Sequence, residues 1–422
     1  MGFCGLDFGT SNSTLGAHGP DGLALIALEA DSTTLPSAIF FDFRTARPLI
    51  GREAIQAYVR GQDGRFMRSL KSVLGTDLID QDTLLDTHRI GFRDVLARLV
   101  GGIKSRAETV IGAPLDSVVH GRPVHFVDGD AEADRRAEAA LEDIAHSAGF
   151  RHVSFQYEPI AAALDYERQV VREEIALIAD IGGGTSDFSI VRLGPARRGR
   201  PDRADDILAN DGIRVGGTDF DRLLSLKAVM PHLGYQSPMT RPGLLAPNGY
   251  FTDLSSWARI NFLYAPRVRA ELMQVERESA RPDLIGRLIA VVEHQLGHRL
   301  AMTVERAKIA LSASKAIKLP LDWIEPSLAA VVSRNGFATA TADLAGSIGR
   351  MVRTCLADAG LAPQSIDAVF LTGGSTLLGN VRHAILGEVP AARIVEGDKF
   401  GSVGLGLTLE AALRYGETPA KI

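Results

Sequence analysis

One short pattern occurs twice in this chain and constrains its fold more than any other feature. The stretch "FCGLDFGTSNST" (3–14) is a mostly apolar run that reaches Asp7, followed by a glycine turn and hydroxyl side chains. The stretch "EIALIADIGGGTSDFSIVRL" (174–193) repeats this order, and Asp180 lies 173 positions (180 minus 7) after Asp7. Each stretch predicts a β-hairpin, because strand-like runs joined by glycine turns are typical of paired strands. The chain is therefore expected to contain two related α/β halves.

The segments around the two hairpins have mixed helical and strand patterns. Apolar spacing predicts helices over 52–61, 65–75 and 92–113, and a third strand–turn–helix segment over 366–386. Pro159 favours a helix that begins near Glu158, since proline is preferred in a first turn. With 422 residues, the chain exceeds what one compact core usually holds, so two or more lobes are expected.

Composition excludes several classes of partner. The formal net charge is −5, whereas a nucleic-acid-binding protein normally has a basic face. The one basic cluster, "ARRGRPDR" (196–203), is interpreted as a solvated loop. No apolar run approaches the ~20 residues of a membrane span, and the two cysteines have no CxxC pattern. We therefore expect a cytoplasmic protein with no nucleic-acid and no membrane partner.

The paired hairpins predict a site for a phosphate and a metal ion. Glycine turns after strands present backbone N–H groups that converge on an anion. If Asp7 and Asp180 face each other they repel, unless a cation lies between them, and hydrated Mg²⁺ suits two carboxylates and a phosphate. A P-loop is excluded because the chain has no GxxxxGK[ST] motif, and a Rossmann turn is excluded because "GGGTSD" leads into a strand.

Seven segments, in the same order, resemble motifs of the nucleotide-binding domain of the DnaK-type chaperones, the heat shock protein 70 family. That family belongs to the actin/sugar-kinase/heat-shock ATPase superfamily. The segments are "GLDFGTSNS" (5–13), "KSVLG" (71–75), "YEPIAAAL" (157–164), "IADIGGGTSDFSI" (178–190), "VGGTDFD" (215–221), "VERAKIALS" (304–312) and "FLTGGST" (370–376). The resemblance covers about residues 3 to 415.

The resemblance implies an α/β fold of the two-lobed, actin-like ATPase type, with ribonuclease H-like duplicated lobes and four subdomains around a central nucleotide cleft. Lobe I would span 1–173, with a core subdomain (1–36 and 114–173) and an inserted subdomain (37–113). Lobe II would span 174–397, with a core subdomain (174–222 and 339–397) and an inserted subdomain (223–338). Residues 398–422 would form a C-terminal helix that returns to lobe I.

The resemblance also implies a role for each matching residue. Lys71 would neutralise charge on the γ-phosphate, Glu158 would position water or relay lobe closure, Asp187 would hold the attacking water and Thr185 would touch the γ-phosphate. Asp7 and Asp180 would hold the waters around Mg²⁺. The residues that would bind ATP or ADP are Gly9, Thr10, Ser11, Asn12, Gly182, Gly183, Gly184, Gly216, Gly217, Glu305, Lys308, Ser312, Gly373, Gly374, Ser375 and Asp398.

The chain departs from the family pattern at four places. Ile309 and Leu377 replace two family arginines, one of which stacks on adenine, so adenine selectivity is put in doubt. Thr218 replaces a glutamate that contacts the other lobe. The chain ends at Ile422, without the family's linker and peptide-binding domain, and so is similar to the short, stand-alone YegD-like members.

The expected function is that of an ATP-binding, slowly hydrolysing, chaperone-like protein. Two alternatives stay open: a small-molecule kinase of the same superfamily, and a non-hydrolysing actin-like nucleotide sensor or polymer. The segment 219–304 is longer than in full chaperones and is mostly helical. Its aromatic residues either fill extra helices or form a surface that binds a protein partner or a second copy of the chain, and we predict such an association.

Overall fold

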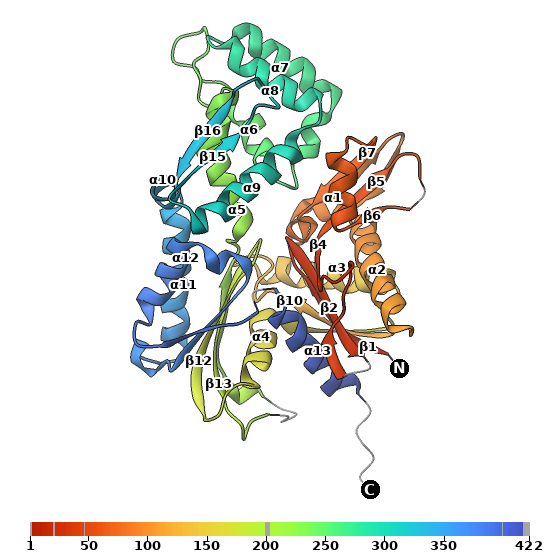
Figure 1. Cartoon of the computed structure of the whole chain (residues 1–422), viewed down its shortest axis with the longest axis vertical. Helices are drawn as coiled ribbons and strands as arrows, with labels where there is room; N and C mark the ends of the chain where they lie inside the picture. The colour runs from red at the N-terminus through yellow and green to blue at the C-terminus, as the bar shows by residue number, and fades with distance from the viewer. Residues whose placement is uncertain (1, 20–21, 46, 199–202, 399, 417–422) are drawn as a thin grey trace. The chain divides into compact units, whose positions relative to one another are not determined.

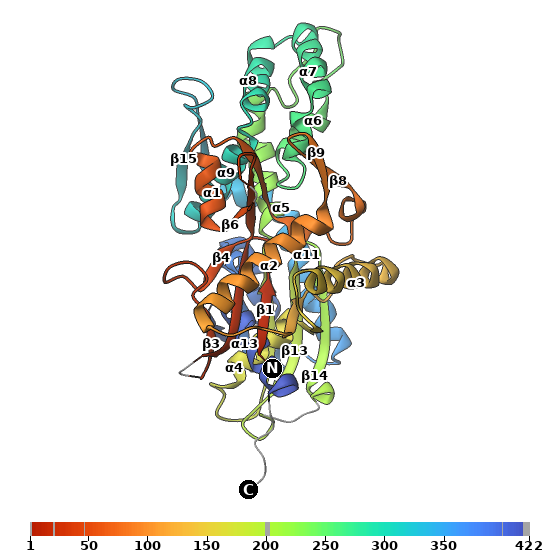
Figure 2. The same cartoon turned by 90° about the vertical axis from the view of Figure 1, so that its right-hand side faces the viewer.

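The computed structural model describes residues 2–19, 22–45, 47–198, 203–398 and 400–416. The chain divides into two compact units, shown from two sides in Figures 1 and 2. The first comprises 1–216, 347–376 and 382–422, and the second comprises 217–346 and 377–381. The first unit contains both predicted hairpins and the glycine turn at 373–374, so most of the predicted site lies in one unit.

The first hairpin lies in a six-stranded sheet with the order β11-β10-β1-β2-β3, and β4 pairs with β2. Its strands are β1 (Phe3–Phe8), β2 (Asn12–Gly19), β3 (Gly22–Leu25), β4 (Thr34–Pro36), β10 (Ser117–Arg122) and β11 (His152–Tyr157). Strands β1 and β2 are antiparallel, whereas β1, β10 and β11 are parallel. In this register Asp7 lies opposite Thr14.

The second hairpin lies in a five-stranded sheet with the order β14-β13-β12-β17-β18. Its strands are β12 (Glu174–Ile181), β13 (Ser186–Leu193), β14 (Ile207–Ile213), β17 (Ala368–Thr372) and β18 (Arg393–Glu396). The two sheets have the same plan, because each has an antiparallel three-stranded meander whose first strand pairs in parallel with the next strand of the sheet. The predicted α/β class and duplicated halves are confirmed.

Two helices, α4 (Glu158–Glu167) and α13 (Ser402–Tyr415), pack together in the core of the first unit (Figure 1). Pro159 lies in the first turn of α4, as predicted. At two points of this packing the backbones approach too closely for a side chain: a Cβ atom at Gly406 would lie 1.8 Å from the backbone oxygen of Ala161. A Cβ atom at Gly5 in β1 would lie 2.2 Å from the backbone nitrogen of Thr408.

The remaining helices of the first unit cover the outer parts of the sheets. They are α1 (Arg52–Val59), α2 (Phe92–Ile111), α3 (Ala131–Ser147), α12 (Gly379–Glu388) and α11 (Ala342–Asp358), the last two of which also contain residues of the second unit. Figure 2 shows α2 crossing the first sheet. The buried residues of α2 recur with helical spacing, which explains why this helix was predicted correctly.

The helix predicted over 65–75 is wrong. The chain there forms strand β7 (Gly64–Arg68), which pairs with β5 (Ala38–Asp42), followed by the 3₁₀ turn η1 (Leu70–Val73). The small sheet β6-β5-β7 also contains β6 (Leu49–Ile50), and β8 (Asp82–Leu85) pairs with β9 (His88–Gly91). Tertiary packing overrides local periodicity here, because Phe66 lies opposite Phe40 and stacks on Tyr58. Ser69 has a φ of 59°, which ends the strand.

The second unit is mostly helical. It contains α5 (Gly217–Leu224), the π-helix η4 (Ser225–Val229), α6 (Asn248–Leu254), α7 (Pro266–Glu278), α8 (Pro282–Glu293), α9 (Gly297–Ala313), the hairpin β15 (Ala316–Pro320) and β16 (Ala329–Ser333), and α10 (Arg334–Ala340). Trp257 is buried beside His298, and Tyr235 packs against Phe251. These aromatic rings therefore pack inside the second unit, among its helices.

The basic cluster at 196–203 is not the solvated loop that we predicted, as far as its described residues go. Arg197 and Arg203 each bind Asp206, and Arg203 also binds the buried Glu167. Arg198 donates to the backbone oxygens of Glu167 and Val170. Residues 199–202 lie outside the described part of the chain. The described arginines therefore hold this loop against the end of α4.

Within the described ranges, no helix combines the length and the apolar character needed to cross a membrane.

Candidate functional site

The two hairpin turns lie against each other, and glycines make this approach possible. A Cβ atom at Gly183 would lie 2.4 Å from Ser11 Oγ, and one at Gly184 would lie 2.8 Å from Thr10 Oγ1. A Cβ atom at Gly216 would lie 2.5 Å from the backbone nitrogen of Gly184. These contacts bring together the predicted phosphate-binding turns after β1 and β12 and the chain end after β14.

The third glycine turn, after β17, meets the same place. Gly373 has a φ of 79°, and a Cβ atom there would lie 2.3 Å from the backbone oxygen of Ile181 and 2.7 Å from Asp180 Oδ1. Ser375 Oγ donates to the backbone oxygen of Gly182 at 3.0 Å. On the opposite side, Ser37 Oγ donates to the backbone oxygen of Gly9 at 2.6 Å. Any side chain at position 373 would therefore push this turn away from Asp180.

Five charged side chains gather next to these turns, and four of them are acidic. Asp7 projects from β1, Asp180 and Asp187 face each other in register on β12 and β13, and Glu158 begins α4. Lys71, on the 3₁₀ turn η1, donates to Glu158 Oε1. Lys71 and Glu158 are both buried, so Lys71 is not the solvated lysine of a surface helix. The sequence placed all five in the site, but it did not predict this ion pair.

The pKa values of the three aspartates are raised. Burial and the charge of Glu158 raise the pKa of Asp7 to about 7 and, likewise, that of Asp187 to about 7. The pKa of Asp180 is raised well above its usual value, first by burial and then by Glu158, Asp187 and Asp7. Burial lowers the pKa of Lys71, but the charges of Glu158 and Asp7 outweigh this, and the net pKa is raised. The cluster therefore carries more negative charge than its surroundings stabilise.

This excess of negative charge fits a hydrated divalent cation. Among the described residues, no group of three or more His, Cys, Asp or Glu side chains is arranged to hold a metal ion directly. Mg²⁺ often keeps several of its waters and takes few carboxylate ligands, so a spread of acidic side chains around a water-filled shell suits it. Asp187 supports this, since its buried Oδ2 atom accepts no hydrogen bond within the described residues.

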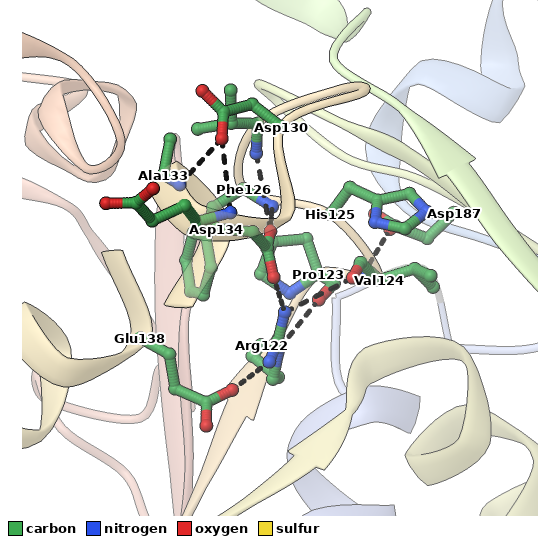
Figure 3. Close-up of polar contacts among 12 residues, drawn as sticks. Arg122, Pro123, Val124, His125, Phe126, Asp130, Ala133, Asp134, Glu138 and Asp187 are labelled. Carbon is green, nitrogen blue, oxygen red and sulfur yellow. Dashed lines mark hydrogen bonds and ion pairs between the residues drawn. The ribbon is translucent and has the colours of Figure 1, made fainter. Parts of the chain in front are cut away.

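Asp187 is held by a loop that the sequence did not single out. The backbone N–H of Val124 donates to Asp187 Oδ1 at 2.7 Å (Figure 3). The next residue, His125, contacts Asp211 Oδ1 on β14 through Nε2 at 3.0 Å. A backbone donor cannot be read from side-chain patterns, so the sequence did not predict this contact.

Some of the predicted binding residues belong to the second unit. Glu305, Lys308 and Ser312 lie at i, i+3 and i+7 on α9. Lys308 Nζ donates to the backbone oxygen of Gly217 at 2.8 Å and to Asp221 Oδ1 at 2.9 Å. In the first unit, Asp398 is exposed and accepts from the Phe400 backbone at 3.1 Å. Thr185 and Asn12 flank the two turns, at the hairpin positions that were predicted.

Comparison with known proteins identifies the family. The model of the Hsp70 protein family matches residues 3–230 and 290–420. The chain belongs to the Hsp70 family. Among its relatives, the chaperone protein DnaK of Thermosipho melanesiensis is 26% identical over 430 residues, and that of Thermotoga neapolitana is 25% identical over 429 residues. Both alignments cover 99% of this chain and 60% of the relative, so the chain spans about 60% of the length of these relatives.

Proposed function

We propose that this Hsp70-family chain binds ATP or ADP with Mg²⁺ and hydrolyses ATP slowly. One observation carries the proposal: three aspartates with raised pKa values lie beside Lys71, next to three glycine turns that approach one another. Backbone N–H groups in such turns suit phosphate oxygens, and the carboxylates suit the waters of the cation. The relatives' names describe chaperones, which supports a chaperone-like role for the nucleotide switch.

Each residue of the first unit then has a chemical task. Gly9, Thr10, Ser11 and the turn 182–184 hold the phosphates through N–H and hydroxyl groups, and Thr185 touches the terminal phosphate. Asp7 and Asp180 bind the water shell of Mg²⁺, which neutralises phosphate charge when bound. Asp187 orients the attacking water through Oδ2 and accepts its proton, while Lys71 stabilises the charge that develops on the transferred group. Such catalysis consists mostly of positioning and electrostatics.

The remaining proposed contacts are those to the nucleoside. Gly216, Gly217, Gly373, Gly374 and Ser375 would line it, Glu305, Lys308 and Ser312 would hold the adenosine, and Asp398 would close the base pocket. Ile309 and Leu377 are both exposed and cannot offer the planar cation of an arginine. The division into two lobes at 173/174, with an inserted subdomain in each, remains part of this proposal. The buried free thiols Cys4 and Cys355 support a reducing, cytoplasmic setting.

Calorimetry tests the proposal directly. We expect ADP and ATP to bind with one site per chain in the presence of Mg²⁺, and considerably more weakly when EDTA removes the metal, because the carboxylates then repel the phosphates. Hydrolysis should be measurable in single turnover. An absence of nucleotide binding in saturating Mg²⁺ would contradict the proposal. Binding without hydrolysis would favour the nucleotide-sensor alternative, and phosphate transfer to a small metabolite would favour the kinase alternative.

The segment 219–304 is proposed to bind a protein partner or a second copy of the chain in one nucleotide state. The family model leaves 231–289 of this segment unmatched. Its aromatic rings are largely inside, so the contact would use polar residues of α7, which exposes most of its side chains. Light scattering and pull-down should show association in one nucleotide state, lost when 234–300 is replaced by a short loop. Equal association in both proteins would contradict this role.

A further inference from the structure

The loop after β10 is irregular, but one buried arginine holds its carbonyl groups. Arg122, the last residue of β10, is 11% exposed. Its Nε donates to the backbone oxygen of Pro123 at 3.1 Å, and its Nη2 donates to that of Val124 at 3.2 Å (Figure 3). The guanidinium also lies 5.2 Å from the ring centroids of both Phe126 and Tyr157. The loop that follows β10 thus wraps around the side chain of Arg122.

The first turns of helix α3 anchor this arginine and hold the amide groups of the same loop. Arg122 Nη2 donates to Asp134 Oδ2 at 2.6 Å, and its Nη1 binds Glu138. The other oxygen of Asp134 accepts from the backbone nitrogen of Phe126 at 2.5 Å. Asp130 caps the helix by accepting from the nitrogens of Glu132 and Ala133. Arg122 therefore holds the carbonyl groups of Pro123 and Val124, and Asp134 holds both Arg122 and the amide of Phe126.

The amide between these fixed points is the one that binds Asp187. Val124 donates to Asp187 Oδ1 at 2.7 Å, while its own carbonyl is held by Arg122. We propose that Arg122 is a positioning residue: together with Asp134 and Glu138, it fixes the loop 123–127 so that the Val124 N–H holds Asp187 in its catalytic rotamer. This rests on the proposed role of Asp187 in hydrolysis, and it assigns a task to an ion cluster that the proposed mechanism does not otherwise use.

The charged groups around Asp187 explain why one backbone donor matters. Asp180 faces it from β12, Glu158 from the start of α4 and Lys71 from η1, and His125 of the same loop pairs with Asp211 on β14. Burial and Glu158 raise the pKa of Asp187, whereas the Thr185 side chain and the Val124 N–H oppose them by stabilising the carboxylate. If the loop shifts, Asp187 loses the backbone donor and the orientation that this donor fixes.

The test compares Arg122→Gln with Arg136→Gln, a matched change on α3 whose exposed arginine binds Glu132 outside the loop. In nucleotide-free protein, we expect exchange of the Val124, Phe126 and Val127 amides to accelerate about tenfold or more in Arg122→Gln only, because the loop is then no longer held with these amides on Asp187 and Asp134. With Mg²⁺ and ATP, turnover should fall about tenfold to hundredfold, as for a lost hydrogen bond to a charged group. Nucleotide affinity should stay within about threefold, so the loss should appear in turnover and not in binding.

Two results would overturn the inference: unchanged exchange of the Val124, Phe126 and Val127 amides, or an equal loss of turnover and of nucleotide affinity, which marks a purely structural role. If Arg122→Gln does not fold, Arg122→Lys decides, since it keeps the charge and the stem over Phe126 but cannot bind both carbonyls and Asp134 at once. Failure of the proposed function is distinguishable, because wild-type protein would then not hydrolyse ATP. The exchange measurement needs no nucleotide and would still answer the question for the loop.

Discussion

Replacing Lys71 by glutamine is expected to slow ATP hydrolysis by about 100- to 1,000-fold, the loss seen when one preorganised donor is removed from an active site. Lys71 is the cation that lies among Asp7, Glu158 and Asp187. Its charge would be most valuable where negative charge develops in the transition state. Nucleotide affinity should change much less, because the glycine turns hold the phosphates in the ground state.

Glutamine is the informative substitution because Glu158 is buried. Alanine would leave that carboxylate without its partner, and a broken buried pair typically costs about 3–5 kcal/mol of folding free energy. A glutamine amide can still donate to Glu158 Oε1, so the carboxylate keeps a hydrogen-bond donor while the positive charge is lost. Lys318→Gln on the exposed face of β15 is the control. An unchanged single-turnover rate in Lys71→Gln would remove Lys71 from the mechanism, and an equal loss in affinity and rate would make it a ground-state ligand.

Asp180→Asn is expected to stabilise the nucleotide-free protein while weakening Mg²⁺-dependent nucleotide binding about 10- to 100-fold, because a charge-assisted contact to the hydrated metal is lost. The two effects have opposite signs for one reason. The carboxylate is buried among like charges, so its charge costs free energy unless the cation is present. We therefore expect the free energy of unfolding of the nucleotide-free protein at pH 8 to be higher in Asp180→Asn than in the wild type.

The direction of the pH dependence follows from the raised pKa values. Asp7 and Asp187 titrate at about 7 in the folded chain, above the value of about 3.9 of an unfolded aspartate. The folded state therefore binds protons more tightly, and its stability falls as the pH rises from about 4 to about 7. Thermal melts of the nucleotide-free protein should show a lower Tm at pH 8 than at pH 5.5, and Mg²⁺ with ADP should reverse the loss.

Matched variants make this test specific. In Asp180→Asn the difference in Tm between pH 5.5 and pH 8 should shrink, whereas in Asp322→Asn, on an exposed turn, it should equal that of the wild type. If Asp180→Asn is less stable than the wild type at both pH values, Asp180 is an ordinary structural carboxylate. If its nucleotide affinity retains the full dependence on Mg²⁺, then Asp180 does not hold the metal.

The sequence predicted those parts of the site that short-range pattern encodes. An aspartate just before or within a glycine turn marks a strand end, and two such turns implied that Asp7 and Asp180 lie together, where the structure places them. Pairs distant in sequence were not predicted: Lys71 and Glu158 are 87 residues apart, and Val124 and Asp187 are 63 apart. Neither pair leaves a local signal, because one depends on a 3₁₀ turn after a strand and the other on a backbone donor.

Errors in the predicted secondary structure have a related cause. The apolar residues of 65–75 fit a helix by spacing. However, Phe66 pairs with Phe40 in β5, which lies 26 residues earlier in the chain (66 minus 40). The arginines of 196–203 suggested a solvated loop, because nothing local shows that Glu167 and Asp206 are buried beneath them. In both cases a contact formed in three dimensions decided the outcome.

The glycine-lined contact of α13 has a mechanical consequence. Where helices interlock by ridges and grooves, a sideways step requires side chains to leave one groove and enter another. At Gly406 on Ala161 and at Gly5 on Thr408, backbone lies directly on its neighbour, whereas Val403 and Leu407 of α13 pack into the same core with their side chains. Shear between packed elements occurs by small slides of this kind. Two backbone-to-backbone contacts therefore lie in the core between the two sheets, and bulky substitutions at these glycines should hinder small slides of α13 against α4 and β1.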